Sequence, residues 1–293
     1  MDTVDRLMKL LPEEAAAALA TRREEVTEIR LRVNRPAQIV FDGTDVLAGA
    51  PIEARRLREI TSALMDHSFY ARETELAQGF FTMTDGSRVG VCGRFAGDGT
   101  RLTDVGSVCV RIARAVPGCA DGLMGLIAPK DGLRSLLIVS PPGLGKTTLL
   151  RDAAKQLSEG GLRVGIADER HELAACHMGV PTLDVGPRTD VADGCPRPRA
   201  IRQLIRTMAP DVIVADEIGG EADAEALADA ARCGVAVIAS VHGRSLGEAA
   251  QRRWIREIVT TRVLETLVLL GERPGHIVEI RSLNERSAEW RRA

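Results

Sequence analysis

Apolar and polar residues alternate in the first part of the chain. Residues 28–33 place charged and apolar side chains in turn, as a half-buried strand does, and residues 37–41 follow a Pro-containing turn as the predicted hairpin partner. A helix is expected over residues 52–68. Further strands are expected at residues 79–83, 87–91 and 108–112. The pattern predicts a small α+β domain.

The second part of the chain contains short, unbroken apolar runs instead. They lie at residues 136–139, 164–167, 212–215 and 235–239, with helix-like stretches between them at residues 147–157, 199–208 and 222–232. Short apolar strands that alternate with helices predict a parallel sheet covered on both faces. A further apolar run at residues 264–270 fits either a buried strand or a short helix.

Composition and chain breakers also divide the sequence in two. All five Phe and the single Tyr lie before residue 96, so the two cores differ in their residue types. Pro and Gly cluster over residues 116–132, which indicates a linker. We therefore predict a small α+β N-terminal domain over residues 1–125 and an α/β domain over residues 126–293.

The overall composition is that of a water-soluble globular protein, with 45% hydrophobic and 27% charged residues. A formal net charge of -2 provides no basic footprint for nucleic acid, which argues against a nucleic-acid partner. The N-terminus carries Asp2 and Asp5 and has no signal-peptide pattern, and no apolar run approaches the roughly 18–20 residues of a membrane span. The six cysteines are scattered, as expected of free thiols in a reducing compartment. These features predict a cytoplasmic chain, which leaves docking on a membrane complex open.

A phosphate-binding loop is predicted directly after the first apolar run of the second part. The loop reads Ser140-Pro141-Pro142-Gly143-Leu144-Gly145-Lys146-Thr147-Thr148, which matches the Walker A pattern GxxxxGK[ST] except that Ser140 replaces the first Gly. Glycines let the backbone wrap around phosphate oxygens, and the following helix directs its N–H groups toward them. Lys146 is expected to reach the β- and γ-phosphates of ATP, and the Thr147 hydroxyl to ligate Mg²⁺.

Acidic residues and a histidine follow the other predicted strands. Asp216 and Glu217 end the run 212–215, as in a Walker B site, where Asp216 would hold Mg²⁺ and Glu217 would polarise the attacking water; a helix-capping role is the alternative. Asp168 and Glu169 follow the run 164–167 and compete for the general-base role, unless they are solvated or paired. His242 follows the run 235–239 and would donate to the γ-phosphate, unless it is structural.

The order of these motifs resembles that in the type II and type IV secretion and pilus ATPases. After the phosphate loop come an acidic box, then Asp216-Glu217-Ile218-Gly219, then Ser240-Val241-His242-Gly243. Within that superfamily the chain is most similar to the stage III sporulation protein AA family, over roughly residues 10–280. The segments that carry this closer resemblance are 28–36, Gly79 with 88–94, 110–114, 118–121 and, most specifically, 184–196.

The resemblance implies a RecA-like P-loop ATPase domain in a homohexameric ring. It implies ATP hydrolysis that energises a secretion-like, membrane-associated complex during sporulation, with membrane proteins of that complex as partners. The N-terminal domain would cover the neighbouring subunit's site and lend it arginines. By their place in matching motifs, Arg88, Arg94, Arg111 and Arg114 are the candidates, with ordinary surface strand positions as the alternative. Arg188 would face the nucleotide or line a ring pore.

The chain also departs from the broader family. The acidic box begins Asp168-Glu169 rather than Glu-Asp, and Gly219-Gly220 stands where an Arg is usual after Ile218, so the identity of the general base stays open. Two other functions remain as hypotheses. A nucleic-acid motor on the same core would show DNA-stimulated hydrolysis with steep salt dependence, and a small-molecule kinase would transfer phosphate to a metabolite.

Overall fold

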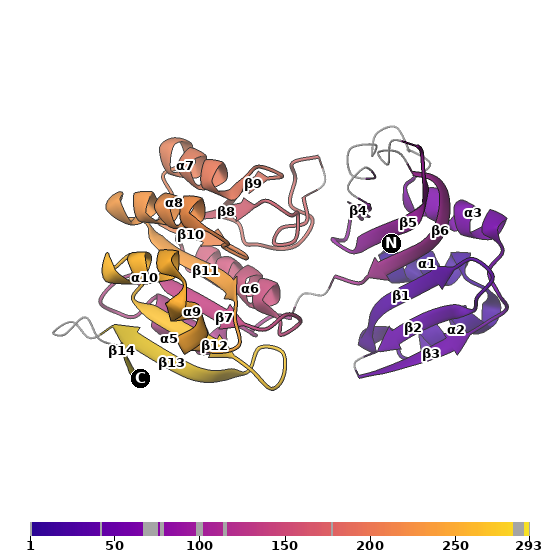
Figure 1. Cartoon of the computed structure of the whole chain (residues 1–293), viewed down its shortest axis with the longest axis horizontal. Coiled ribbons are helices and arrows are strands. Elements are labelled where there is room, and N and C mark those ends of the chain that lie inside the picture. The colour runs from indigo at the N-terminus through magenta and orange to yellow at the C-terminus, as the bar shows by residue number, and fades with distance from the viewer. Residues whose placement is uncertain are drawn as a thin grey trace. The chain divides into compact units, whose positions relative to one another are not determined.

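The computed structural model describes residues 2–41, 43–66, 76, 79–97, 102–113, 116–176, 178–283 and 290–292. The chain divides into two compact units, Met1–Arg114 and Ala115–Ala293 (Figure 1). The division falls earlier than the predicted boundary at residue 125. The reason is that Ala120, Leu123 and Ile127 pack with strand residues of the second unit, so the segment after Arg114 belongs to that core.

The first unit is an α+β unit, in which helices pack against one face of a β-sheet. Its strands are β1 (Val26–Arg32), β2 (Ala37–Phe41), β3 (Thr44–Ala48), β4 (Phe80–Thr82), β5 (Arg88–Phe95) and β6 (Leu102–Arg111). Its helices are α1 (Thr3–Leu10), α2 (Glu13–Thr21) and α3 (Ala54–Leu64), with a short 3₁₀ turn η1 (Arg23–Glu25). The six strands form one sheet in the order β3-β2-β1-β6-β5-β4. Each pair of adjacent strands in this sheet is antiparallel. The expected hairpin of β1 and β2 is present.

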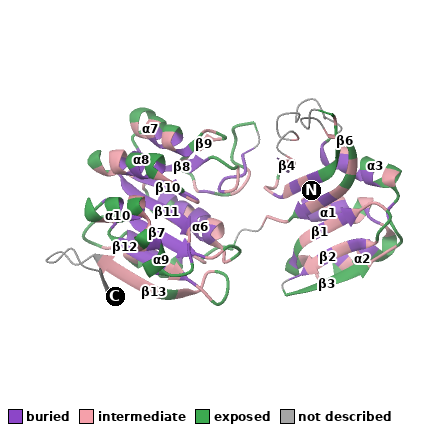
Figure 2. Cartoon of the chain, viewed as in Figure 1, coloured by how far each residue is buried: buried purple, intermediate pink, exposed green. Residues whose placement is uncertain are grey.

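One face of this sheet carries the apolar positions of the alternating strands. Ile39, Ile29, Val110 and Val89 form a buried row across this face, and the fully buried Phe81 of the edge strand β4 continues it. The alternate positions face away from this core, and Figure 2 shows how burial changes from residue to residue along the strands. The sheet therefore presents its polar positions on the opposite face.

The second unit is an α/β layer structure. Its strands are β7 (Leu136–Ser140), β8 (Val164–Asp168), β9 (Thr189–Asp193), β10 (Val212–Ala215), β11 (Ala236–His242), β12 (Thr266–Leu270), β13 (Ile277–Leu283) and β14 (Trp290–Arg292). Its helices are α5 (Asp121–Ile127), α6 (Lys146–Glu159), α7 (Arg197–Met208), α8 (Glu221–Arg232), α9 (Leu246–Gln251) and α10 (Arg253–Thr260).

The sheet of the second unit is mixed rather than all parallel. Its strand order is β14-β13-β12-β7-β11-β10-β8-β9. The six strands β12, β7, β11, β10, β8 and β9 are parallel, and β13 and β14 add antiparallel strands at one edge. The four predicted strands β7, β8, β10 and β11 are parallel as expected, and the antiparallel strands β13 and β14 were not predicted. The short connection between β12 and β13 explains the difference, because a tight loop joins only antiparallel neighbours. The ambiguous run 264–270 contributes strand β12.

Helices cover both faces of this sheet, as the apolar strands predicted. Alternate strand residues point to opposite sides: Ile213 packs with α7 to α10, whereas Val212 and Val214 pack with α5 and α6. β10 is buried along its whole length. Because β7, β8, β10 and β11 are parallel neighbours, their carboxyl ends meet at one edge of the sheet, which is where the predicted site residues lie. Among the described residues, none of the helices has both the length and the apolarity that a membrane span requires.

Candidate functional site

The loop between β7 and α6 has the backbone that a phosphate loop needs. Gly143 and Gly145 have φ angles of 79° and 80°, a region in which L side chains are strained, and Gly145 directly precedes the first turn of α6. The N-cap residue Gly145 has no side chain to cap this helix end, so the first N–H groups of α6 can receive an anion. Ser140 is not among the residues with positive φ, and its buried hydroxyl donates to the Pro141 carbonyl at 2.8 Å. This position therefore needs no glycine, which explains the departure from the Walker A pattern.

Lys146 begins α6 and is 5% exposed. Its ammonium Nζ lies 3.2 Å from the Pro141 carbonyl oxygen and 3.2 Å from His242 Nδ1. Burial lowers the pKa of Lys146 below its usual value, and the carboxylates of Asp216 and Glu217 act in the opposite direction. An ammonium can only donate, so Nδ1 of His242 accepts and the ring proton resides on Nε2.

Asp216 joins the phosphate loop to the end of β10. Its Oδ2 accepts a hydrogen bond from the Thr147 hydroxyl, and its Oδ1 accepts one from Ser240. The same Ser240 oxygen accepts from the backbone N–H of Glu217 at 2.9 Å. The hydroxyl of Thr147 and the carboxylate of Asp216 are hard oxygen ligands, so these two groups fit a Mg²⁺ ion that keeps several waters.

Ser240 is a site residue to which the sequence motifs assigned no role. It lies within β11, is fully buried and links β10 to β11 through Asp216 and Glu217. The available signal was its place two residues before His242: alternate residues of a strand share a face, so Ser240 and His242 point the same way.

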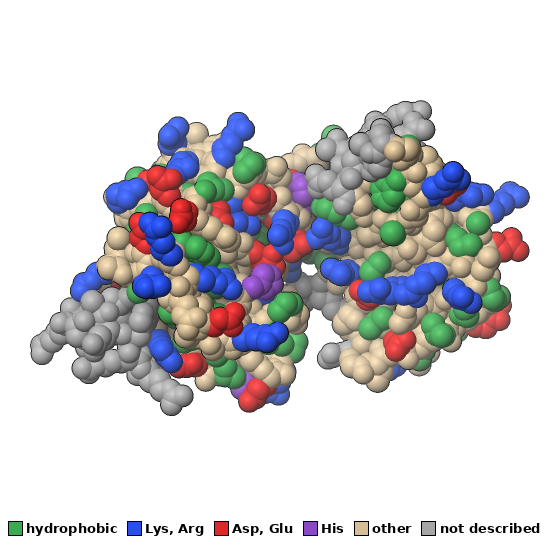
Figure 3. Space-filling model, in the orientation of Figure 1, with side chains coloured by type: hydrophobic (Ala, Val, Ile, Leu, Met, Phe, Trp, Pro, Cys, Tyr) green, Lys and Arg blue, Asp and Glu red, His purple; other side chains and the backbone are tan. Residues whose placement is uncertain are grey.

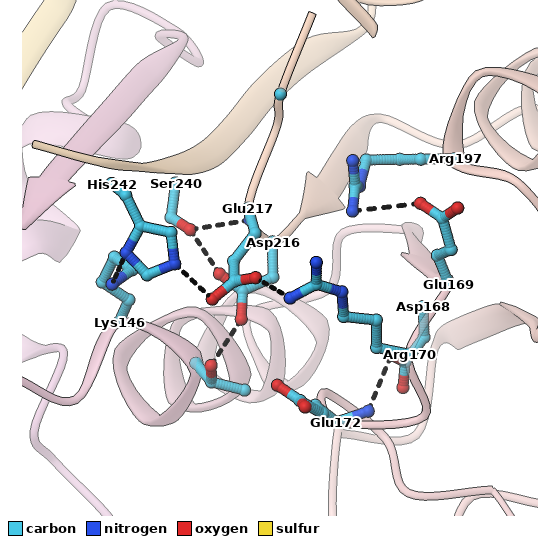
Figure 4. A network of polar contacts seen from close by, with 12 residues as sticks. Lys146, Asp168, Glu169, Arg170, Glu172, Arg197, Asp216, Glu217, Ser240 and His242 are labelled. Atoms are coloured by element: carbon cyan, nitrogen blue, oxygen red, sulfur yellow. Dashed lines mark hydrogen bonds and ion pairs between the residues drawn. The ribbon is translucent and has the colours of Figure 1, made fainter. Parts of the chain in front are cut away.

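Glu217 is held at both carboxylate oxygens (Figure 4). Nε2 of His242 donates to its Oε1 at 2.7 Å, and the Arg170 guanidinium donates to its Oε2. The backbone of Glu217 has a φ of 52°, an uncommon conformation for a residue with a side chain. The result is a polar chain that runs from Lys146 through His242 and Glu217 to Arg170.

Asp168 and Glu169 have different partners. The Asp168 carboxylate is 3% exposed and accepts from the backbone N–H groups of Glu172 at 2.8 Å and Ala174 at 2.9 Å. Burial raises the pKa of the Asp168 carboxyl, although these backbone donors lower it in part. Glu169 pairs with Arg197 at 3.1 Å. The structure therefore brings Asp216, Glu217 and His242 together at Lys146 and uses Asp168 and Glu169 in neighbouring contacts.

Arg197 belongs to a second buried pair that the sequence did not indicate. Its NH1 lies 2.9 Å from Asp223, whose carboxylate also accepts from the N–H of Gly219 at 2.7 Å. Gly219 follows Glu217 and Ile218, so this pair positions the turn that carries Glu217. A basic residue at the start of α7 and an acidic one in α8 are too far apart in sequence for pattern reasoning to join them.

The segment from Asp184 to Arg188 packs on the last turns of α6. Asp184 pairs with Lys155 at 2.6 Å, and Arg188 donates through its backbone N–H and its guanidinium to Ser158. A Cβ on Gly186 would lie 2.5 Å from that of Ser158. The guanidinium of Arg188 thus contacts α6 at the end farthest from the phosphate loop, away from the expected place at the nucleotide, and its place in a ring pore stays a prediction.

Two of the predicted arginines of the first unit, Arg88 and Arg111, lie on the polar face of its sheet. Strand register sets Arg88 opposite Arg111 and Arg111 opposite Glu28, with the Nε of Arg111 3.5 Å from the Glu28 carboxylate. Arg88 stacks over the Phe80 ring, and Arg94 is exposed farther along β5. Figure 3 shows Lys and Arg side chains gathered in a row across this unit. The remaining candidate, Arg114, lies outside the described residues.

A family model shows which family the chain belongs to. The model described as "Sporulation stage III, protein AA" matches residues 4–289. The chain is a member of this sporulation family. Stage III sporulation protein AA of Bacillus subtilis (strain 168) is 36% identical over 284 residues, which is 93% of this chain and 92% of that protein.

Solved structures with a similar fold are secretion and pilus ATPases. The ATPase DotB of Legionella pneumophila has a TM-score of 0.62 at 14% identity, over 90% of this chain and 78% of that one. The pilus retraction motor PilT, solved with bound ADP, has a TM-score of 0.63 at 16% identity, over 92% of this chain and 83% of that one. At these identities the likeness concerns the fold alone. The expected resemblance to this superfamily is confirmed at that level.

Proposed function

We propose that this member of the sporulation family binds ATP with Mg²⁺ and hydrolyses it. The observation that carries the proposal is the hydrogen bond between Thr147 and Asp216, which joins a glycine-bearing loop at a helix N-terminus to an acidic pair from a distant strand. Residues that are 69 positions apart meet there. A Gly-rich turn that binds no nucleotide does not require a buried lysine with two carboxylates beside it.

Each group of the cluster has a role in this proposal. The N–H groups at the start of α6 and the Lys146 ammonium hold the phosphate oxygens, and Thr147 and Asp216 hold the ion. Mg²⁺ supplies neutralisation of the phosphate charge when it is bound. Glu217 orients the attacking water as general base, and His242, which contacts both Lys146 and Glu217, responds to the γ-phosphate.

The wider proposal is a ring-shaped motor of a sporulation complex. The family membership supports a role in sporulation, and the fold shared with DotB and PilT supports a chain that converts hydrolysis into mechanical work on membrane-associated partners. In this hexamer the arginine-rich sheet face of the first unit would serve a neighbouring subunit's phosphates. A forked guanidinium such as that of Arg111 suits this task because it pairs with two phosphate oxygens at once.

The test is an ATPase assay on size-separated protein. Lys146→Ala should lose nucleotide binding and turnover, because the phosphates lose their buried cation. Glu217→Gln should keep binding but lose about 100-fold or more in kcat, the scale of removing one group that acts in the transition state. Chelation of Mg²⁺ should stop turnover of the wild type. Arg206→Ala, an exposed position on α7, serves as the matched surface control.

Several results would count against the proposal. A monomer whose activity survives both Lys146→Ala and Glu217→Gln would exclude this site as the seat of hydrolysis. Hydrolysis that rises with single-stranded DNA and falls steeply with salt would favour a nucleic-acid motor instead. Phosphate transfer to an added metabolite rather than to water would indicate a kinase.

A further inference from the structure

Arg170 is a cation at the candidate site that no motif of the sequence explains. It follows β8 by two positions, and its side chain is 58% exposed. Its guanidinium nevertheless contacts Glu217, whose side chain is only 18% exposed. Because more than half of the Arg170 side chain is exposed, packing does not hold it in a single conformation.

The backbone that carries Arg170 is fixed relative to the phosphate loop. The Asp168 carboxylate holds the N–H groups of Glu172 and Ala174, as described above. From α6, the buried Arg151 donates to the carbonyls of Leu173 and Glu172, both at 2.6 Å. The loop that carries Arg170 is therefore anchored to Asp168 and to α6 through the residues that follow Arg170.

The contact with Arg170 occupies the carboxylate oxygen of Glu217 that His242 leaves open. One carboxylate oxygen accepts from His242 and the other from Arg170, so both oxygens already have partners (Figure 4). A general base must offer an oxygen to the proton it takes. Departure of Arg170 opens Oε2 and leaves Oε1 oriented by His242.

The charges at the site supply a reason for that departure. In the described structure, Lys146 and Arg170 face Asp216 and Glu217. ATP adds several negative charges at the phosphate loop, and its terminal phosphate offers a guanidinium more acceptor oxygens than a single carboxylate oxygen does. ADP places no phosphate at that terminal position. Electrostatic attraction therefore favours transfer of the Arg170 guanidinium from Glu217 to the terminal phosphate when ATP is bound, and not when ADP is bound.

We propose that Arg170 is a γ-phosphate sensor acting within its own subunit: it blocks Glu217 in the nucleotide-free site and releases it by moving to the terminal phosphate of ATP. The inference rests on the proposed function, and it adds a residue and a switching step to it. Arg170 couples the presence of the correct nucleotide to the exposure of the general base. Hydrolysis then removes the phosphate and lets the arginine return to Glu217.

The experiment compares the binding of a non-hydrolysable ATP analogue with that of ADP, both with Mg²⁺. Arg170→Ala should weaken binding of the analogue by about tenfold or more and change ADP binding by less than about twofold, because only the analogue carries the phosphate that Arg170 contacts. Arg170→Lys should recover part of the lost affinity, since it keeps the charge but not the fork.

Arg163→Ala is the matched control. Arg163 is 57% exposed and pairs with Asp211 at 2.6 Å, so its removal also breaks an exposed arginine–carboxylate pair. Both partners precede their strands, β8 and β10, and so lie at the opposite edge of the sheet from the site. This variant should leave the affinities for both nucleotides unchanged.

A double-mutant cycle separates the sensor from a merely structural arginine. Glu217→Gln removes the charge that holds Arg170, so it should tighten binding of the analogue, and this gain should vanish in the Arg170→Ala background. Equal losses for the analogue and ADP, or no loss for either, would overturn the sensor. Wild-type protein that binds neither nucleotide would overturn the proposed function itself, whereas wild-type binding with an unchanged ratio in Arg170→Ala overturns the sensor alone.

Discussion

Asp168 and Asp216 come from neighbouring parallel strands, yet the fold uses their carboxylates for different tasks. Asp216 lies just beyond β10 and contacts Thr147 at the phosphate loop, together with Ser240. Asp168 is the last residue of β8, and its oxygens bind backbone N–H groups of the following loop. In the sheet order β10 lies one strand nearer to β7 than β8 does, so Asp216 reaches the phosphate loop and Asp168 supports the loop after its own strand.

Asp168→Ala should destabilise the protein before it affects chemistry. It would leave the buried N–H groups of Glu172 and Ala174 without an acceptor, which costs about 1–3 kcal/mol in the free energy of unfolding. Urea unfolding followed by circular dichroism measures this loss. Asp190→Ala, which removes an exposed carboxylate from β9, should change stability by less than about 0.5 kcal/mol.

The competing interpretation of Asp168 predicts the opposite pattern. A general base can be removed with little loss of stability but at a cost of about 100-fold or more in kcat. Full stability of Asp168→Ala together with such a loss of turnover would return the general-base role to Asp168. Loss of stability with ATP affinity largely retained would show that Asp168 supports the loop that follows β8.

At the scale of elements, α6 connects the phosphate loop to the segment from Asp184 to Arg188. Lys146 and Thr147 lie in its first turn, and Lys155 and Ser158 near its end contact Asp184 and Arg188. Arg151 between them holds the loop that carries Arg170. The segment from Asp184 to Arg188 thus braces the helix whose N-terminus forms the candidate site.

Gly186→Ala tests this bracing. The residue has a φ of 91°, and an added methyl group would lie 2.5 Å from the Cβ of Ser158, so the loop must lift from α6. Gly161→Ala is the matched control, because its φ of 101° imposes similar backbone strain with nothing within 4 Å of the new methyl group. We expect Gly186→Ala to be about 1–3 kcal/mol less stable than Gly161→Ala in thermal or urea unfolding. Equal stability of the two variants would show that the segment does not need its close contact with α6.

At the scale of the whole molecule, the chain combines two units with separate cores. The second unit holds the phosphate loop, the acidic pair and His242, and the first presents an arginine-bearing sheet face. Arg111 on that face is 68% exposed, which leaves its guanidinium accessible to a second charged partner besides Glu28. A ring of subunits is the arrangement in which such a face would serve a site on another copy.

Subunit mixing tests whether Arg111 acts in trans. Arg111→Ala and Lys146→Ala should each be inactive alone. In an equal mixture, roughly a quarter of the interfaces would combine an intact Lys146 with an intact Arg111 from the neighbour, so a corresponding share of turnover should return. Steady-state hydrolysis over a series of mixing ratios measures this recovery. Arg55→Ala, on the exposed side of α3, should be active without mixing. If no ratio restores activity, Arg111 does not serve a neighbouring site.

The sequence by itself determined the features that depend on local chemistry. The apolar runs predicted β7, β8, β10 and β11 within a few residues, because a strand buried on both faces must be apolar throughout. The glycines before Lys146 and the helix behind it predicted the phosphate loop, because positive φ angles and a free helix end are local properties. The meeting of Asp216, Glu217 and His242 at one sheet edge followed from parallel strand direction alone.

Only the tertiary structure decided which partner each polar side chain takes. The pairing of Arg170 with Glu217, the support of Glu217 by Ser240 and the anchoring of Arg188 on α6 all join residues more than 20 positions apart. The antiparallel edge of β13 and β14 and the early division after Arg114 likewise depend on which cores the segments join. Periodicity reports the direction in which a side chain points along its own element. The identity of its neighbour is set by how the elements pack.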